Sequence, residues 1–125
     1  LLLHYLLCEY GFLLRCGVAP FLDDIADPEE LDFDGIRELF TRVSAARLEY
    51  LAMVTEGELD EVIEIKLMGK PLRLARWQML AQALLQSIHH RGELSIVMTS
   101  LGYPLPTLDP ILQFIRDSGQ EWPSV

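Results

Sequence analysis

The stretch "LLQSIHHRGELSI" (residues 84–96) places two histidines and an arginine inside an otherwise apolar run. The run belongs to a long helix that the sequence predicts over about residues 74–101, with Gly102 just past its end. Gly92 costs this helix about 1 kcal/mol relative to alanine. Such a cluster in a helix interior indicates either a bound group or a close partner.

Residues four apart share one face of a helix, so His90 aligns with Gln86 and Gln82. His89 points about 100° away from that face, because each helical residue turns by that angle. Two adjacent histidines therefore do not serve one metal ion from a regular helix. The pair that can act together is Gln86 with His90, and we expect His89 at the surface or in an interface.

Apolar periodicity predicts two further long helices. Residues 1–16 are apolar almost throughout, and Gly17 ends that run. After a loop over residues 17–32 with one helical turn, Asp32 or Asp34 is a cap for a helix to about Thr55, ended by Gly57. The apolar face of that helix follows spacings of three, four and seven through Ile36, Phe40, Val43, Tyr50 and Val54.

Residues 61–74 have a different period. Ile63, Ile65 and Leu67 alternate with charged residues, which is typical of a strand with one buried face, and a Gly-Lys-Pro turn follows. The pattern predicts a short β-hairpin or extended excursion. Beyond the long helix, Asp109 is a cap for a last short helix through about Asp117.

Together these elements predict an all-α fold: one domain over residues 1–125, an antiparallel four-helix bundle with the hairpin or excursion before its long helix. The opening helix is apolar on nearly every side and needs cover on more than one face. The chain starts in mid-pattern and without Met, so we expect a first helix upstream of these residues. Pairing in a homodimer is the alternative cover.

Composition excludes several classes of function. The net charge of −9 is the wrong sign for binding nucleic acid or an anionic membrane surface. The apolar opening is interrupted by His4 and Glu9 and falls short of the roughly 20 residues of a membrane span. Neither the basic start nor the cleavage site of a signal peptide is present.

The two cysteines predict a reducing compartment. Cys8 and Cys16 lie on one predicted helix, where eight residues span about 12 Å. A disulfide needs Cα atoms within roughly 7 Å. Thiols that cannot pair indicate a cytoplasmic protein.

Another histidine, His4, lies in the opening helix. If this helix packs beside the long one, His4 can face His90 in the interior, which is how metal sites are built in helical bundles. Cys8 lies one turn from His4 and is a soft neighbour, although its simplest role is that of a small core residue. Arg91 is expected to form a structural ion pair with Glu93 or Glu9.

Three motifs carry a resemblance to a known family. The runs "HHRGEL" (89–94), "LGYPLPTLDPI" (101–111) and "LLHYLLCEYGFLL" (2–14) resemble the DinB/YfiT-like superfamily of metal-dependent four-helix bundles. The third resembles the second helix of that fold, with a histidine followed five residues later by glutamate. The resemblance covers nearly the whole chain, without the family's first helix.

The resemblance implies a metal site with three histidine ligands. His4 matches the first ligand and His90 the last, but the middle position holds Gln86. An imidazole suits a divalent metal such as Zn, Ni or Fe far better than an amide oxygen does. The expected site is therefore weakened or lost. The alternative is a pair of buried, hydrogen-bonded histidines with no ion.

Two functions follow. The first is a divalent-metal-dependent transferase or hydrolase acting on a small thiol or small-molecule substrate, with His4, Gln86 and His90 as ligands and no identifiable general base. The second is a non-catalytic, metal-free bundle that binds a small ligand or serves as a dimeric scaffold. Neither the substrate nor the reaction follows from the sequence.

Overall fold

The computed structural model describes residues 1–18, 24, 27–106 and 110–121. The chain divides into two compact units, Leu1–Leu94 and Ser95–Val125. The elements in order are α1 (Leu2–Arg15), the 3-10 turn η1 (Pro28–Glu30), α2 (Phe33–Met53), α3 (Glu56–Asp60), β1 (Val62–Leu67), β2 (Lys70–Ala75), α4 (Arg76–Ser100) and α5 (Pro110–Asp117).

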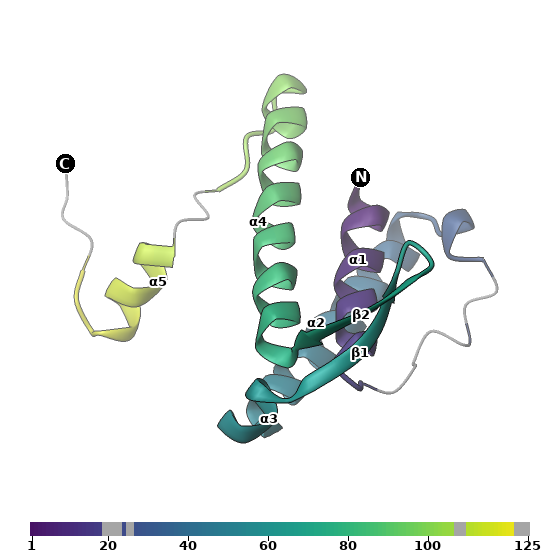
Figure 1. Ribbon diagram of the computed structural model, residues 1–125. Helices are drawn as coiled ribbons and strands as arrows, with labels where there is room; N and C mark the ends of the chain where they lie inside the picture. Colours follow the sequence, from purple (N-terminus) through teal and green to yellow (C-terminus); the bar gives the residue numbers. More distant parts are fainter. Residues whose placement is uncertain (19–23, 25–26, 107–109, 122–125) are drawn as a thin grey trace. The chain divides into compact units, whose positions relative to one another are not determined.

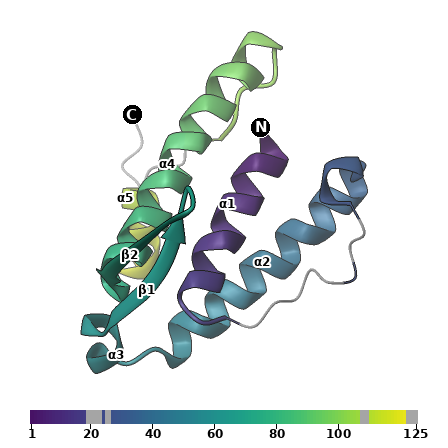
Figure 2. The same ribbon diagram turned by 45° about the vertical axis from the view of Figure 1, so that its right-hand side comes forward.

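In the first unit, α1 lies between α2 and α4 (Figures 1 and 2). Helices α1 and α2 run in the same direction, so that Glu9 pairs with Arg47 and Cys16 packs with Tyr50. Helix α4 runs the opposite way, which sets its residue Ser87 beside Tyr5. For two consecutive helices to run in parallel, the chain between them must return along the full length of the first. Helix α1 is about 21 Å long for its 14 residues, and the connection between α1 and α2 has enough residues to cover that distance.

The all-α fold class predicted from the sequence is wrong. Strands β1 and β2 form a regular two-stranded antiparallel sheet, so the fold is mostly helical with a β-hairpin and is not a four-helix bundle. The uniform antiparallel arrangement is also wrong, since α1 and α2 run together (Figure 2). Hydrophobic periodicity shows which face of each helix is buried, but it does not show the direction of a helix relative to its neighbours.

The hairpin itself lies where alternation predicted it. Leu67 pairs with Lys70, and the two loop residues, Met68 and Gly69, have φ angles of 51° and 77°. Positive φ at both central positions is what a type I′ turn requires, and its twist matches that of the strands. Ile65 is buried, and this side of the hairpin packs on Cys16 and Met79.

The predicted boundaries of the second helix are right at its start and wrong at its end. The carboxylate of Asp32 accepts a hydrogen bond from the backbone N–H of Gly35 at 2.8 Å, which caps α2. The helix stops at Met53 because Thr55 starts a new one: Thr55 and Glu58 form a capping box. Gly57 therefore lies inside α3 and does not end α2.

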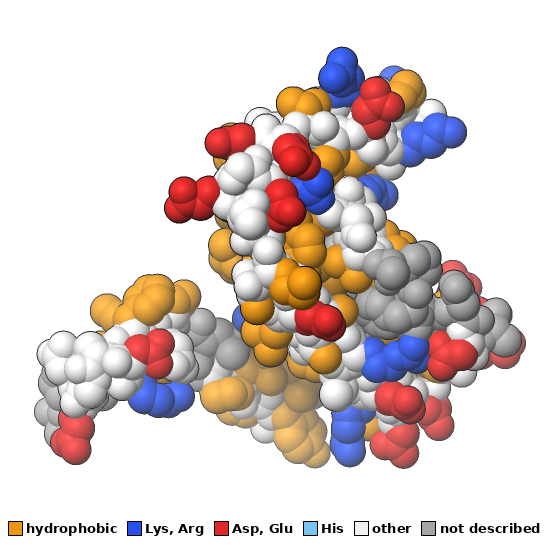
Figure 3. Space-filling view, turned by 90° about the horizontal axis from the view of Figure 1, so that it is seen from below, with side chains coloured by type: hydrophobic (Ala, Val, Ile, Leu, Met, Phe, Trp, Pro, Cys, Tyr) orange, Lys and Arg blue, Asp and Glu red, His pale blue; other side chains and the backbone are white. Residues whose placement is uncertain are grey.

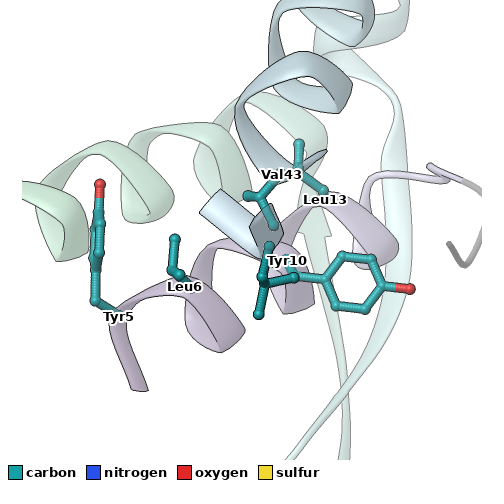
Figure 4. Packing of buried hydrophobic residues seen from close by; sticks show 6 residues of the cluster. Tyr5, Leu6, Tyr10, Leu13 and Val43 are labelled. Atoms are coloured by element: carbon teal, nitrogen blue, oxygen red, sulfur yellow. The ribbon is translucent and has the colours of Figure 1, made fainter. Parts of the chain in front are cut away.

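The principal core lies between α1 and α2 (Figure 4). Its fully buried centre is formed by Leu6 of α1 with Leu39 and Val43 of α2. The predicted apolar face of α2 is partly right. Val43 is buried, but Phe40 is 42% exposed, and Leu39 takes the central position.

Arg76, the first residue of α4, ties three elements together. Its guanidinium donates hydrogen bonds to the carbonyl oxygens of Cys16 and of Glu58, and it pairs with the carboxylate of Glu61 at 3.2 Å. A cation at this place also compensates the partial negative charge at the end of α1. The contacts fix the end of α1 against α3 and the hairpin.

In the second unit, Gly102 follows the end of α4 with a φ of 85°, and the backbone N–H of Tyr103 donates a hydrogen bond to the carbonyl of Met98. Helix α5 ends at Asp117, as predicted, whereas its expected cap, Asp109, lies outside the described residues. Within the described parts of the chain, no helix has both the length and the apolar character to cross a membrane.

Candidate metal centre

The centre lies where the start of α1 meets α4. His4 is exposed in the first turn of α1, Cys8 is half-buried one turn later, and His90 of α4 is only 6% exposed. The antiparallel packing of the two helices is fixed locally by Tyr5, whose hydroxyl shares a 2.9 Å hydrogen bond with Ser87 and accepts another from Arg91. His90 is thereby held opposite His4.

The three side chains come close enough to share one ion. The rings of His4 and His90 meet edge to face with centroids 4.8 Å apart. One donor atom from each of His4, Cys8 and His90 lies within 4.8 Å of the other two, and the Cys8 sulfur is 3.6 Å from His4 Nε2. Nitrogen and sulfur ligands of a tetrahedral zinc ion lie about 3.6 Å apart, given bond lengths of about 2.0 and 2.3 Å. The separation of the Cys8 sulfur and His4 Nε2 therefore matches that of two ligands of one zinc ion.

Gln86 contacts the same imidazole. Its side-chain nitrogen lies 2.9 Å from Nε2 of His90, and its oxygen accepts a hydrogen bond from the amide of Gln82 at 3.3 Å. The amide N–H of Gln86 thus engages the lone pair on Nε2 of His90. Metal binding through Nε2 requires Gln86 to turn its amide or move aside.

On its other side, His90 faces a carboxylate. Nδ1 of His90 lies 3.4 Å from an oxygen of Glu93. A proton on Nδ1 donated to Glu93 leaves Nε2 as the acceptor, which agrees with the contact to Gln86. Metal-bound histidines usually donate their other N–H to a carboxylate in this way.

His89 lies outside the cluster, as the helix geometry predicts. Its side chain is 64% exposed and pairs with the second oxygen of Glu93. His89, His90 and Glu93 form a second close group of donors on α4. Because Glu93 already bridges the two rings, we assign it to orientation of His90.

Burial raises the pKa of the Cys8 thiol, and the positive charge of Arg15 opposes this effect only in part. Cys8 is therefore a neutral thiol at physiological pH. A metal ion must displace its proton, since the ligand form of cysteine is the thiolate.

The structure brings together His4, Gln86 and His90, the three residues that the sequence singles out. It adds Cys8, which the sequence analysis treated chiefly as a core residue. The signal was present, because His4 and Cys8 are four residues apart and share one helix face.

The expected ion pairs of Arg91 and Glu9 are not formed. The buried carboxylate of Glu9 pairs with Arg47 of α2, and Arg91 donates to the Tyr5 hydroxyl instead. Both observed partners lie on other helices, and the choice among such partners depends on how the helices pack.

Comparisons of the chain with family models, with curated proteins and with solved structures give no match. The resemblance to the DinB/YfiT-like superfamily therefore stays a prediction. The case for a metal centre rests on the geometry of the residues themselves.

Proposed function

We propose that this protein binds one divalent metal ion through His4, Cys8 and His90 and uses it in a reaction on a small molecule. The observation that carries the proposal is that the three donor atoms lie mutually within 4.8 Å. Two imidazoles with one thiolate favour zinc among the available metals, ahead of nickel and iron. With Cys8 as the third donor, Gln86 need not supply a ligand.

The exposed position of His4 supports a catalytic site over a closed structural one, which would have four protein ligands. A bound zinc ion acts as a Lewis acid and lowers the pKa of a coordinated water or thiol to near neutrality. We propose a transferase or hydrolase reaction on a small thiol or other small-molecule substrate. These are the classes that the DinB/YfiT-like resemblance implies.

The chain's own residues orient and polarise this site. Glu93 accepts the Nδ1 proton of His90 and thereby holds Nε2 as a lone-pair donor. Once turned away from His90, the amide of Gln86 would be available to donate a hydrogen bond to a substrate. Tyr5, bonded to Ser87 and Arg91, keeps the two helices in register.

Metal analysis of protein purified without a histidine tag tests the proposal. We expect one zinc ion per chain after dialysis against zinc and then against buffer. His4→Ala should lose the ion and keep its fold, because His4 is exposed, whereas His89→Ala is the matched control and should retain it. Zinc bound equally by wild type and His4→Ala, or by neither, would overturn the site.

One observation favours a second candidate, a metal-free module. The side chains of Gln86 and Glu93 engage both ring nitrogens of His90. A buried imidazole with both nitrogens satisfied is stable as a structural residue. A zinc affinity no higher than that of an unrelated protein with exposed histidines would favour this candidate.

We also propose a cytoplasmic location, since two separated thiols persist best in a reducing compartment. Homodimer formation stays a prediction as well. Its support is the exposure of large apolar side chains of α2 and α4 that do not line the groove described below, among them Leu48, Met53 and Leu85. The mass of the full-length protein by light scattering tests it.

A further inference from the structure

A groove separate from the metal centre lies in the first unit, bounded by α1, α2 and α4. Its volume is about 480 Å³, within the range of about 300–1,000 Å³ that small-molecule sites occupy. The apolar lining comes from all three helices and includes Leu13, Leu51, Leu80, Leu84 and Ile88. Figure 3 shows one face of the molecule, on which hydrophobic side chains stand exposed between acidic ones.

The groove holds an unneutralised positive charge. Two arginines line it, and one of them, Arg47, is paired with the buried carboxylate of Glu9. The other, Arg91, donates one hydrogen bond, to the Tyr5 hydroxyl. Within the described part of the chain, no carboxylate pairs with Arg91. A guanidinium has five N–H donors, so most of those of Arg91 stay available.

This local charge is the opposite of the charge of the whole chain, which is −9. The charged groups of the groove, two arginines and one glutamate, sum to one positive charge. The groove therefore combines an apolar surface with one cation whose planar N–H groups match a carboxylate in bidentate geometry. A phosphate dianion would bring a second negative charge close to Glu9 without a second free cation.

We propose that this groove binds a small anionic amphiphile, an apolar molecule with a single carboxylate. The carboxylate pairs with Arg91, and the apolar body covers Leu51, Leu84 and Ile88, which are each 50% exposed or more without it. None of the three proposed metal ligands lines the groove. The inference therefore stands or falls independently of the metal centre.

Titration calorimetry on the chelator-treated full chain tests the proposal, with octanoate, octanol and octylammonium as the probes. Octanoate should bind once per chain and at least about tenfold more tightly than octanol, because charge-assisted hydrogen bonds to Arg91 add to the same apolar burial. Octylammonium should bind more weakly than octanol. This comparison on the unmodified protein needs no variant to fold.

Variants then test whether Arg91 is the cation that binds the carboxylate. Arg91→Gln should reduce octanoate affinity to that of octanol, and Arg91→Lys should retain part of the preference. Arg73→Gln is the matched control, since Arg73 is an exposed arginine of β2 that does not line the groove, and it should leave the affinity unchanged.

Three results would overturn the proposal. The first is equal affinity for octanoate and octanol, and the second is an octanoate affinity that Arg91→Gln leaves intact. The third is no binding of any probe together with a dimer, seen by light scattering, that Leu84→Glu dissociates. That result would make the groove a contact between two copies of the chain.

Discussion

Cys8 lies within α1 and Cys16 is the C-cap of the same helix, yet the surroundings of the two thiols differ. Cys8 is half-buried beside an imidazole, with its sulfur 3.6 Å from His4 Nε2. Cys16 is 2% exposed and packs with Ile65 of the hairpin and Met79 of α4. The Cys8 sulfur has a potential metal ligand as its neighbour, whereas Cys16 packs among core residues and lies near Tyr50 and Arg76.

The difference arises from helix geometry and from the antiparallel course of α4. Eight residues advance about 12 Å along a helix and turn it by about 80° beyond two full turns. Cys8 therefore lies near the end of α1 that meets His90, and Cys16 near the end that meets Met79 and the hairpin. The residue type alone did not distinguish a ligand from a core thiol.

The largest expected effect is the difference in zinc affinity between a variant of Cys8 and a variant of Cys16. Cys8→Ser replaces a thiolate with a hydroxyl, a far poorer zinc ligand, and should weaken zinc binding by about 100-fold or more. Cys16→Ser should leave the zinc affinity nearly unchanged. Competition against a chromophoric chelator measures both constants in the same buffer.

Circular dichroism at the same temperature provides the control, because both variants must be folded for the comparison to hold. Equal losses of zinc affinity in the two variants would mean that the ion responds to folding and not to Cys8. An unchanged affinity in Cys8→Ser would remove the thiol from the ligand set.

The candidate metal centre was predictable in part. Period and spacing placed Gln86 and His90 on one face and predicted that His4 would meet them. The participation of Cys8 depends on which part of the α1 surface turns toward α4, and that is decided by contacts such as Tyr5 with Ser87. Tertiary contacts of this kind leave no pattern in one sequence.

The fold was likewise predictable only in part from the sequence. The hairpin followed from alternation and from a glycine at the turn, and the end of α2 was in principle readable from the Thr55–Glu58 capping box. The parallel course of α1 and α2 was not readable, because a long connection allows either direction. Pairings between helices, such as Glu9 with Arg47, follow from that direction.

A second prediction sharpens the role of the amide. Gln86→His places an imidazole where the family resemblance expects one, and should tighten zinc binding by at least roughly tenfold because imidazole is the better donor. Gln82→His is the matched control. Gln82 lies one turn earlier on the same face and contacts Gln86, whereas Gln86 is the residue that contacts His90. Equal tightening by both variants would show nonspecific binding to added histidines.

A third prediction compares the cysteines by chemical reactivity. In the native protein, iodoacetamide should modify Cys8 several-fold faster than Cys16, because Cys16 is buried and burial raises the pKa of its thiol. Zinc should protect Cys8 and leave the slow rate of Cys16 unchanged. Peptide mass spectrometry of timed samples gives both rates from one reaction, so Cys16 is an internal control. Protection of both thiols by zinc would indicate a general tightening of the fold.

The smallest expected effect concerns stability at alkaline pH. Burial raises the pKa of the Cys16 thiol above its ordinary value of 9.0, and burial likewise raises the pKa of the Tyr50 phenol above 10.0. Above those ordinary values the folded chain holds more protons than the unfolded chain, so the free energy of unfolding falls as pH rises. The stabilisation is complete below the pKa values of the unfolded chain and is lost as pH rises through those of the folded chain.

Thermal melts from about pH 8 to about pH 10 should show a falling Tm, with a smaller fall in Cys16→Ala because one of the two groups no longer titrates. A Tm that declines equally in wild type and Cys16→Ala would mean that the thiol at the hairpin end of α1 does not contribute to the alkaline loss.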